Sequence, residues 1–178
     1  SGTSPDGQAL TYYGSLRVEE YRAPQFLVDV RSTSAVAERG TKLSARASAR
    51  YLFGGAMAGA DLSWTALRST TSVQPPGWDA YAFGVELAWW DDDAPTERSE
   101  VTASGRGAIG TSGEFAIDAG VAETPGDRPW RYTVEAEVVD VSRQRVADRT
   151  EVVIHPAAAY AGVRVSGDGF AEEGKPVD

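Results

Sequence analysis

His155 is the only histidine of this 178-residue chain, so a Ser-His-Asp relay would have to use it. The chain has no nucleophile-elbow pattern that would place a serine beside it. A histidine that precedes a proline, here Pro156, at the end of an expected strand is usually a surface or linker residue. The chain also has no cysteine, which excludes disulfides, thiolate zinc sites and thiol nucleophiles. We therefore predict no catalytic residue and no enzyme activity.

Acidic residues gather at Asp91–Asp93, with Glu97 and Glu100 nearby, and carboxylate oxygens are ligands that calcium accepts. Their spacing does not match an EF-hand loop, and adjacent aspartates point in divergent directions. A solvated acidic loop is the favoured interpretation. The chain also lacks a phosphate-binding G-x-x-x-x-G-K-[ST] motif and an HExxH motif. The sequence thus predicts no metal site and no cofactor.

Five tryptophans need an explanation: Trp64, Trp78, Trp89, Trp90 and Trp130. Trp64 and Trp130 fall where strands are expected and should lie in the core. Trp89 and Trp90 are adjacent, so on a strand they face opposite sides, and one is exposed or covered by a neighbouring domain. An alternative is a carbohydrate-binding or adhesin-type module that stacks sugar rings on Trp78, Trp89 and Trp90.

The charge balance narrows the choice of partners. The 17 Lys and Arg residues against 26 Asp and Glu residues give a formal net charge of −9, which repels a phosphate backbone. The longest apolar stretches are far shorter than the roughly 20 residues that span a bilayer. The polar start, Ser1–Leu10, does not resemble an export signal. We expect neither nucleic-acid binding nor direct membrane contact.

Alternation of apolar and polar residues is the dominant pattern, and it predicts half-buried strands. Gly and Pro interrupt the chain at short intervals and no sustained helical stripe occurs, so helices should be absent or single turns. The fold class predicted is all-β, an antiparallel immunoglobulin- or fibronectin-like sandwich. The strands are expected in these segments: 11–20, 24–31, 43–51, 62–66, 85–90, 100–105, 114–118, 130–139, 145–154 and 160–165, with an irregular insertion at 69–82.

About ten strands exceed the seven to nine of one such sandwich, so the outermost ones are expected to belong to neighbouring domains. Proline at Arg22–Pro24 and at His155–Pro156 breaks the strand pattern at both ends. The predicted organisation is the end of a preceding domain at 1–21, one complete sandwich at 22–156, and the start of a following domain at 157–178.

Three stretches resemble the alpha-2-macroglobulins, especially their bacterial members. Residues 16–28, LRVEEYRAPQFLV, resemble the junction at which one macroglobulin domain ends and the next begins. Residues 51–60, YLFGGAMAGA, are similar to the Y-x-F-G-x-P-x-x-G-A turn of the family, with Ala56 in place of the proline, and residues 78–84 resemble the segment just beyond this turn in bacterial members. The third stretch, IHP at 154–156 with YAGV at 160–163, is similar to the exit into the next domain.

The resemblance implies a scaffold segment of a large inhibitor that entraps a proteinase after cleavage of a bait region. The thioester of the family needs a cysteine, so that chemistry cannot lie within these 178 residues. The implied partners are the adjacent macroglobulin domains and, through the full-length protein, target proteinases. The implied location is periplasmic or secreted, and bacterial members of the family are often inner-membrane lipoproteins.

The residues singled out for this role lie at the junctions and in the turn motif. Tyr21, Pro24 and Tyr160 are predicted to transmit domain motion at the junctions. Gly54 and Gly59 are predicted to supply left-handed backbone positions in the turn of the family motif.

Overall fold

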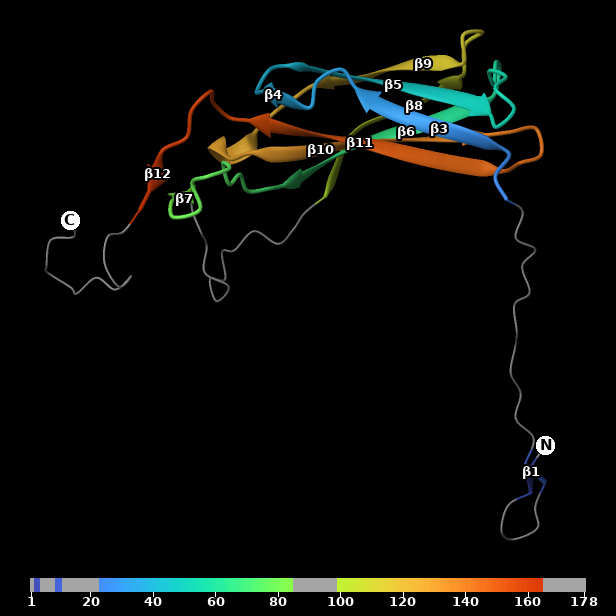
Figure 1. Ribbon diagram of the computed structural model, residues 1–178, viewed down its shortest axis with the longest axis horizontal. Coiled ribbons are helices and arrows are strands. Elements are labelled where there is room, and N and C mark those ends of the chain that lie inside the picture. Colours follow the sequence, from blue (N-terminus) through green and yellow to red (C-terminus); the bar gives the residue numbers. More distant parts are fainter. Residues whose placement is uncertain (1, 4–8, 11–22, 85–98, 165–178) are drawn as a thin grey trace, which may run out of the picture.

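Strands dominate the computed structural model, which describes residues 2–3, 9–10, 23–84 and 99–164 (Figure 1). The strands are β1 (Gly2–Thr3), β2 (Ala9–Leu10), β3 (Phe26–Ser32), β4 (Val36–Glu38), β5 (Lys42–Tyr51), β6 (Asp61–Thr70), β7 (Ala82–Phe83), β8 (Glu100–Ala108), β9 (Glu114–Val121), β10 (Trp130–Val139), β11 (Arg145–His155) and β12 (Gly162–Val163). Within these residues the helical content is one 3₁₀ turn, Pro125–Asp127, and no helix is long and apolar enough to cross a membrane.

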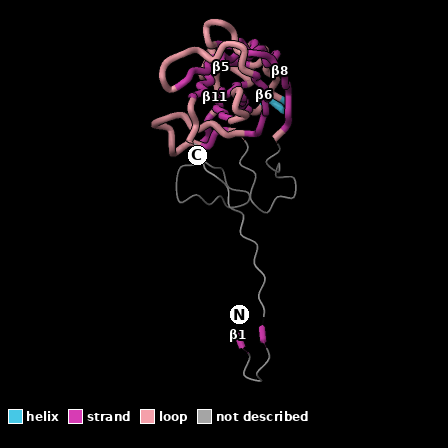
Figure 2. Tube along the Cα trace, turned by 90° about the vertical axis from the view of Figure 1, so that its right-hand side faces the viewer, coloured by secondary structure: helices cyan, strands magenta, loops and turns pink. Residues whose placement is uncertain are grey.

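Two sheets pack face to face and form the predicted immunoglobulin-like sandwich (Figures 1 and 2). One sheet has the order β3-β5-β9, and the other has the order β4-β11-β10-β6-β8. All pairs within them are antiparallel except β4 with β11, which run parallel over Val36–Glu38. The short parallel strand arises because the chain leaves β3 in the first sheet and joins the edge of the second. Fold class and architecture are therefore confirmed, with this one parallel pair added.

The core follows from the alternation seen in the sequence. In β5, every second residue from Leu43 to Ala49 is at most 4% exposed, and the residues between them face outward. The same alternation in β10 buries Tyr132, Val134, Ala136 and Val138. Burial of one such aliphatic side chain stabilises the fold by roughly 1.5–3 kcal/mol. Many of the core residues are alanines, which allow the two sheets to approach each other closely.

Most strand predictions within the described residues are confirmed, and β10 has the predicted bounds. The predicted strands at 11–20 and 85–90 lie outside the described residues. The described part of the predicted strand 160–165, residues 160–164, contains only the two-residue β12, which pairs with β7 at the end of the predicted insertion. That insertion is irregular from Thr71 to Tyr81.

Asp140 to Gln144 form the turn that joins β10 to β11. The Asp140 carboxylate accepts the Gln144 backbone N–H at 2.8 Å, and the Asp140 N–H donates to the Gln144 carbonyl at 3.0 Å. Arg143 takes the left-handed conformation, φ 63°, that reverses the chain. This turn fixes the register of β10 against β11.

The chain enters and leaves the sandwich at opposite ends. β3 begins next to the end of β5, because Phe26 pairs with Tyr51. β4 follows β3 and so lies at the opposite end of the sandwich from Phe26. The last residues of β11 pair with β4, Val153 with Val36, so β11 ends there. We refer to these as the incoming end and the outgoing end (Figure 1).

Candidate functional site

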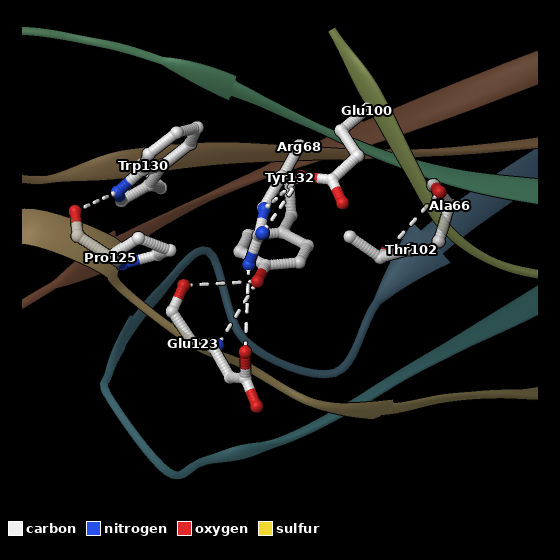
Figure 3. A network of polar contacts seen from close by, with 8 residues as sticks. All are labelled: Ala66, Arg68, Glu100, Thr102, Glu123, Pro125, Trp130 and Tyr132. Atoms are coloured by element: carbon white, nitrogen blue, oxygen red, sulfur yellow. Dashed lines mark hydrogen bonds and ion pairs between the residues drawn. The ribbon is translucent and has the colours of Figure 1, made fainter.

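Arg68 on β6 is a charged residue whose side chain is largely buried, at 14% exposure (Figure 3). Its Nη2 lies 2.7 Å from Oε2 of Glu100, Nη1 lies 3.7 Å from Oε2 of Glu123, and the guanidinium lies 5.2 Å from the centre of the Trp130 ring. Burial lowers the pKa of Arg68, but hydrogen bonds and charge from Glu100 and Tyr132 outweigh burial and raise the pKa above its ordinary value. Arg68 therefore stays charged and is held in place by carboxylates and an aromatic ring.

Arg68 lines a groove of about 570 Å³ between β8 and β9, the edge strands of the two sheets on this side. Three carboxylates share the groove: Glu100, Asp118 and Glu123. Hydrogen bonds to Lys42 and to the Gly120 N–H lower the pKa of Asp118, so it remains ionised. Glu100 and Glu123 pair with Arg68, and Asp118 pairs with Lys42 at 2.7 Å, so all three carboxylates of the groove are ion-paired.

The Tyr132 hydroxyl joins this network from the core. It donates to the Glu123 carbonyl and accepts from the Glu123 N–H, both at 3.0 Å, and the residue is 2% exposed. The arrangement resembles the tyrosine corner of immunoglobulin-like domains, where a tyrosine near the start of a strand holds the preceding crossover. This role was not predicted from the sequence. The sequence feature that could have indicated it is the position of Tyr132, the third residue of β10, directly after the chain crosses from one sheet to the other.

Tyr160 lies at the outgoing end, where three contacts hold the departing chain. Its hydroxyl lies 2.5 Å from Nδ1 of His155 on β11. Burial raises the pKa of Tyr160 above its ordinary value. Beyond it, β12 pairs with β7, and the guanidinium of Arg164 lies 5.4 Å from the centre of the Tyr81 ring. His155 is thus half-buried and bonded to the outgoing chain, a contact that the linker interpretation did not include.

The insertion supplies aromatic residues to the same end. Trp78 packs edge-on against Tyr81 at 5.0 Å between ring centres, and Tyr81 lies 6.5 Å from Phe83. With Tyr160, these rings line a pocket of about 310 Å³. Trp78 is 51% exposed, whereas Trp64 and Trp130, predicted to lie in the core, are half-buried and pack against it. Trp89 and Trp90 lie outside the described residues, so the sugar platform that they would form with Trp78 stays a prediction.

Gly54 and Gly59 lie at the incoming end, in the loop that joins β5 to β6. Both take positive φ values, 98° and 81°, a region that favours glycine. The Gly54 N–H donates to the Tyr51 carbonyl at 2.8 Å, and the Gly59 N–H donates to the Ile109 carbonyl at 2.8 Å. The loop is therefore firmly hydrogen-bonded with Ala56 at the position of the family's proline.

The structure separates the predicted junction residues. Pro24 is exposed and lies two residues before β3, at the same end as Gly54 and Gly59, whereas Tyr160 lies at the outgoing end beside His155. Tyr21 lies outside the described residues. Of the acidic cluster, Asp91–Asp93 and Glu97 also lie outside, and Glu100 pairs with Arg68. Within 23–84 and 99–164, no group of three His, Asp or Glu residues is arranged to hold a metal ion.

Comparison with known proteins gives consistent results. A family model described as the bacterial alpha-2-macroglobulin MG5 domain matches residues 26–156. An alpha-2-macroglobulin homologue from Nostoc sp. (strain PCC 7120) is 28% identical over 151 residues, which are 85% of this chain and 8% of that protein. The chain thus spans less than a tenth of the length of this curated relative.

Solved structures show the same fold. The native conformation of E. coli alpha-2-macroglobulin superimposes with a TM-score of 0.65 at 15% identity, over 84% of this chain and 9% of that one. Trypsin-activated alpha-2-macroglobulin from E. coli gives a TM-score of 0.65 at 14% identity, over 82% of this chain and 10% of that one. At these identities the likeness concerns the fold alone.

Proposed function

Because this chain belongs to the family of bacterial alpha-2-macroglobulin MG5 domains, we propose that it is one scaffold link of a bacterial alpha-2-macroglobulin-like endopeptidase inhibitor that traps proteinases. The observation that carries the proposal is the match over residues 26–156, which covers the whole sandwich. The chain aligns with only 8% of a curated relative, as one domain of a longer protein would. The inhibitory activity then belongs to the parent protein, and this domain contributes no catalytic step.

The placement of the two ends supports a role as a link. Motion that arrives through Pro24 must cross the entire sandwich before it reaches Tyr160. Between the two ends, the sandwich is stabilised by the long pairing of β10 with β11 and by the ion pairs of Arg68 with Glu100 and Glu123. A rigid body joined to its neighbours by short linkers moves as a unit when those neighbours rearrange. Adjacent macroglobulin domains are its proposed direct partners.

Proteinases are the proposed partners of the parent protein, and the periplasm or the extracellular space is its proposed location. A relative of this fold from E. coli is described as trypsin-activated, which makes trypsin a suitable probe. The −9 charge and the paired surface carboxylates give no basis for nucleic acid as a partner.

The test incubates the full-length parent with trypsin and follows two substrates, a large protein and a small chromogenic peptide. Trapping predicts that hydrolysis of the large protein falls while hydrolysis of the peptide persists. Residues 1–178 alone should change neither rate. Undiminished cleavage of the large protein by the parent-treated trypsin would refute the proposed function, as would inhibition by this domain on its own.

A further inference from the structure

An exposed apolar cluster at the incoming end has no role within the sandwich. Leu52 is 62% exposed and Phe53 is 83% exposed, both in the loop after β5, and Val141 in the β10–β11 turn is 94% exposed. We call these three side chains the apolar tip. Val141 and Tyr51 line the same pocket of about 200 Å³, and the Phe53 ring stacks on Tyr51, so the two loops lie next to each other.

The loop that carries Leu52 and Phe53 is held in one conformation. The Phe53 ring lies 4.9 Å from the Tyr51 ring with an angle of 6° between their planes. The Tyr51 N–H donates to the Gly55 carbonyl at 2.8 Å, and Met57, which is 2% exposed, anchors the far side of the loop in the core. A preorganised aromatic residue loses little conformational entropy on docking, which favours its use as an interface anchor.

The incoming chain identifies the surface that the tip faces. The Leu52 N–H donates to the Gln25 carbonyl at 2.9 Å, so the segment that leads into β3 runs directly beside the tip. Each residue spans at most about 3.6 Å, so a folded unit joined through Pro24 is held close to Leu52 and Phe53. An exposed apolar cluster beside the connection to another folded unit is typical of an interdomain contact.

From this geometry we propose that the apolar tip docks into an apolar surface of the domain that precedes residue 23 in the parent chain. The proposal rests on the proposed function, in which this sandwich is one link of a longer chain, and it names the partner of this end. Phe53 is the central anchor, Leu52 and Val141 flank it, and Pro24 limits the directions in which the preceding domain can be placed.

Photocrosslinking in the full-length parent tests the contact. Val141 is replaced by p-benzoylphenylalanine, and the cross-linked peptides are identified by mass spectrometry. The expected product joins Val141 to a peptide that lies before residue 23 of the same chain. Val36, which is 62% exposed at the outgoing end, carries the same probe as a control and should not give that product.

A second set of variants shows whether the tip itself makes the contact. Leu52→Ser with Phe53→Ser should lower the yield of the Val141 cross-link by about tenfold, because each of these side chains contributes substantial apolar burial when docked. Val121→Ser, a change of the same type on a residue that is 61% exposed and pairs with Lys42 at the far end of β5, should leave the yield unchanged.

Three results would overturn the inference: a cross-link only to peptides after residue 156, a cross-link to a second copy, or a yield that the Leu52 and Phe53 changes do not alter. The trypsin assay of the unmodified parent is read separately. A parent that traps trypsin but lacks the cross-link refutes the docking alone, whereas a cross-link without trapping refutes the inhibitor function alone.

Discussion

The hydroxyl of Tyr132 satisfies both backbone groups of Glu123 at the crossing from β9 to β10. Tyr132 is in the core at 2% exposure. Removal of its hydroxyl therefore takes away the hydrogen-bond partner of the Glu123 N–H and C=O without giving water full access to them. Tyr132→Phe should therefore reduce the free energy of unfolding by about 1–3 kcal/mol, measured by urea denaturation.

Tyr51→Phe provides the matched control. Tyr51 is half-buried, and its hydroxyl makes no hydrogen bond with the residues that the structure describes. Its loss should change the free energy of unfolding by less than about 0.5 kcal/mol. Equal effects of the two substitutions would show that the Glu123 contact does not stabilise the crossover.

β8 and β9 meet where the Phe115 ring of β9 packs over Gly107 of β8. A Cβ atom at Gly107 on β8 would lie far inside contact distance of Cε2 of Phe115 on β9. Gly107→Ala should force the Phe115 ring out of its position and destabilise the domain by about 1–3 kcal/mol in urea unfolding.

The compensating change tests this interpretation. In a Gly107→Ala background, Phe115→Leu provides room for the new methyl group, so the two changes together should cost less than the sum of their separate effects. Additive effects would mean that the glycine is needed for another reason.

The outgoing end should respond to alkaline pH through Tyr160. Burial raises the pKa of Tyr160, so the folded chain holds the phenolic proton more tightly than the unfolded chain, whose tyrosine titrates near about 10. The stabilisation from this contact is complete below that pH and is lost as pH rises through the raised pKa. Subtracting the tyrosinate absorbance titration of Tyr160→Phe from that of the wild type should give a midpoint above about 10. A midpoint at or below that value would contradict burial of the hydroxyl.

The elements themselves were largely predictable from the sequence, because alternation reports directly which side of a strand is buried. Leu43 to Ala49 and Trp130 to Val139 are examples in which the pattern and the strand agree. The contacts of His155 with Tyr160 and of β7 with β12 join residues that no local pattern connects, so only the three-dimensional structure shows them. The Tyr132 contact with Glu123 could be recognised only once the crossing from one sheet to the other was known.

In the molecule as a whole, the features that can connect the sandwich to neighbouring domains lie at its two opposite ends. The apolar tip lies beside the incoming chain, and the His155–Tyr160 contact and the β7–β12 pair hold the outgoing chain. Between them, the described part of the chain forms one continuous core that includes both sheets. Changes at either end should thus affect communication with neighbours more than they affect the stability of the sandwich.

This arrangement predicts a separation of trapping from folding in the full-length parent. Tyr160→Ala removes the His155 contact and one wall of the aromatic pocket, which loosens the outgoing chain. Coupling between sites is on the order of 1–3 kcal/mol, so the fraction of trypsin trapped should fall by about fivefold or more while the unfolding midpoint of the sandwich changes little. Tyr160→Phe, which keeps the ring, should have a smaller effect, and Tyr21→Ala should act similarly at the incoming junction. Undiminished trapping by the Tyr21→Ala and Tyr160→Ala variants would mean that these junctions do not transmit the rearrangement.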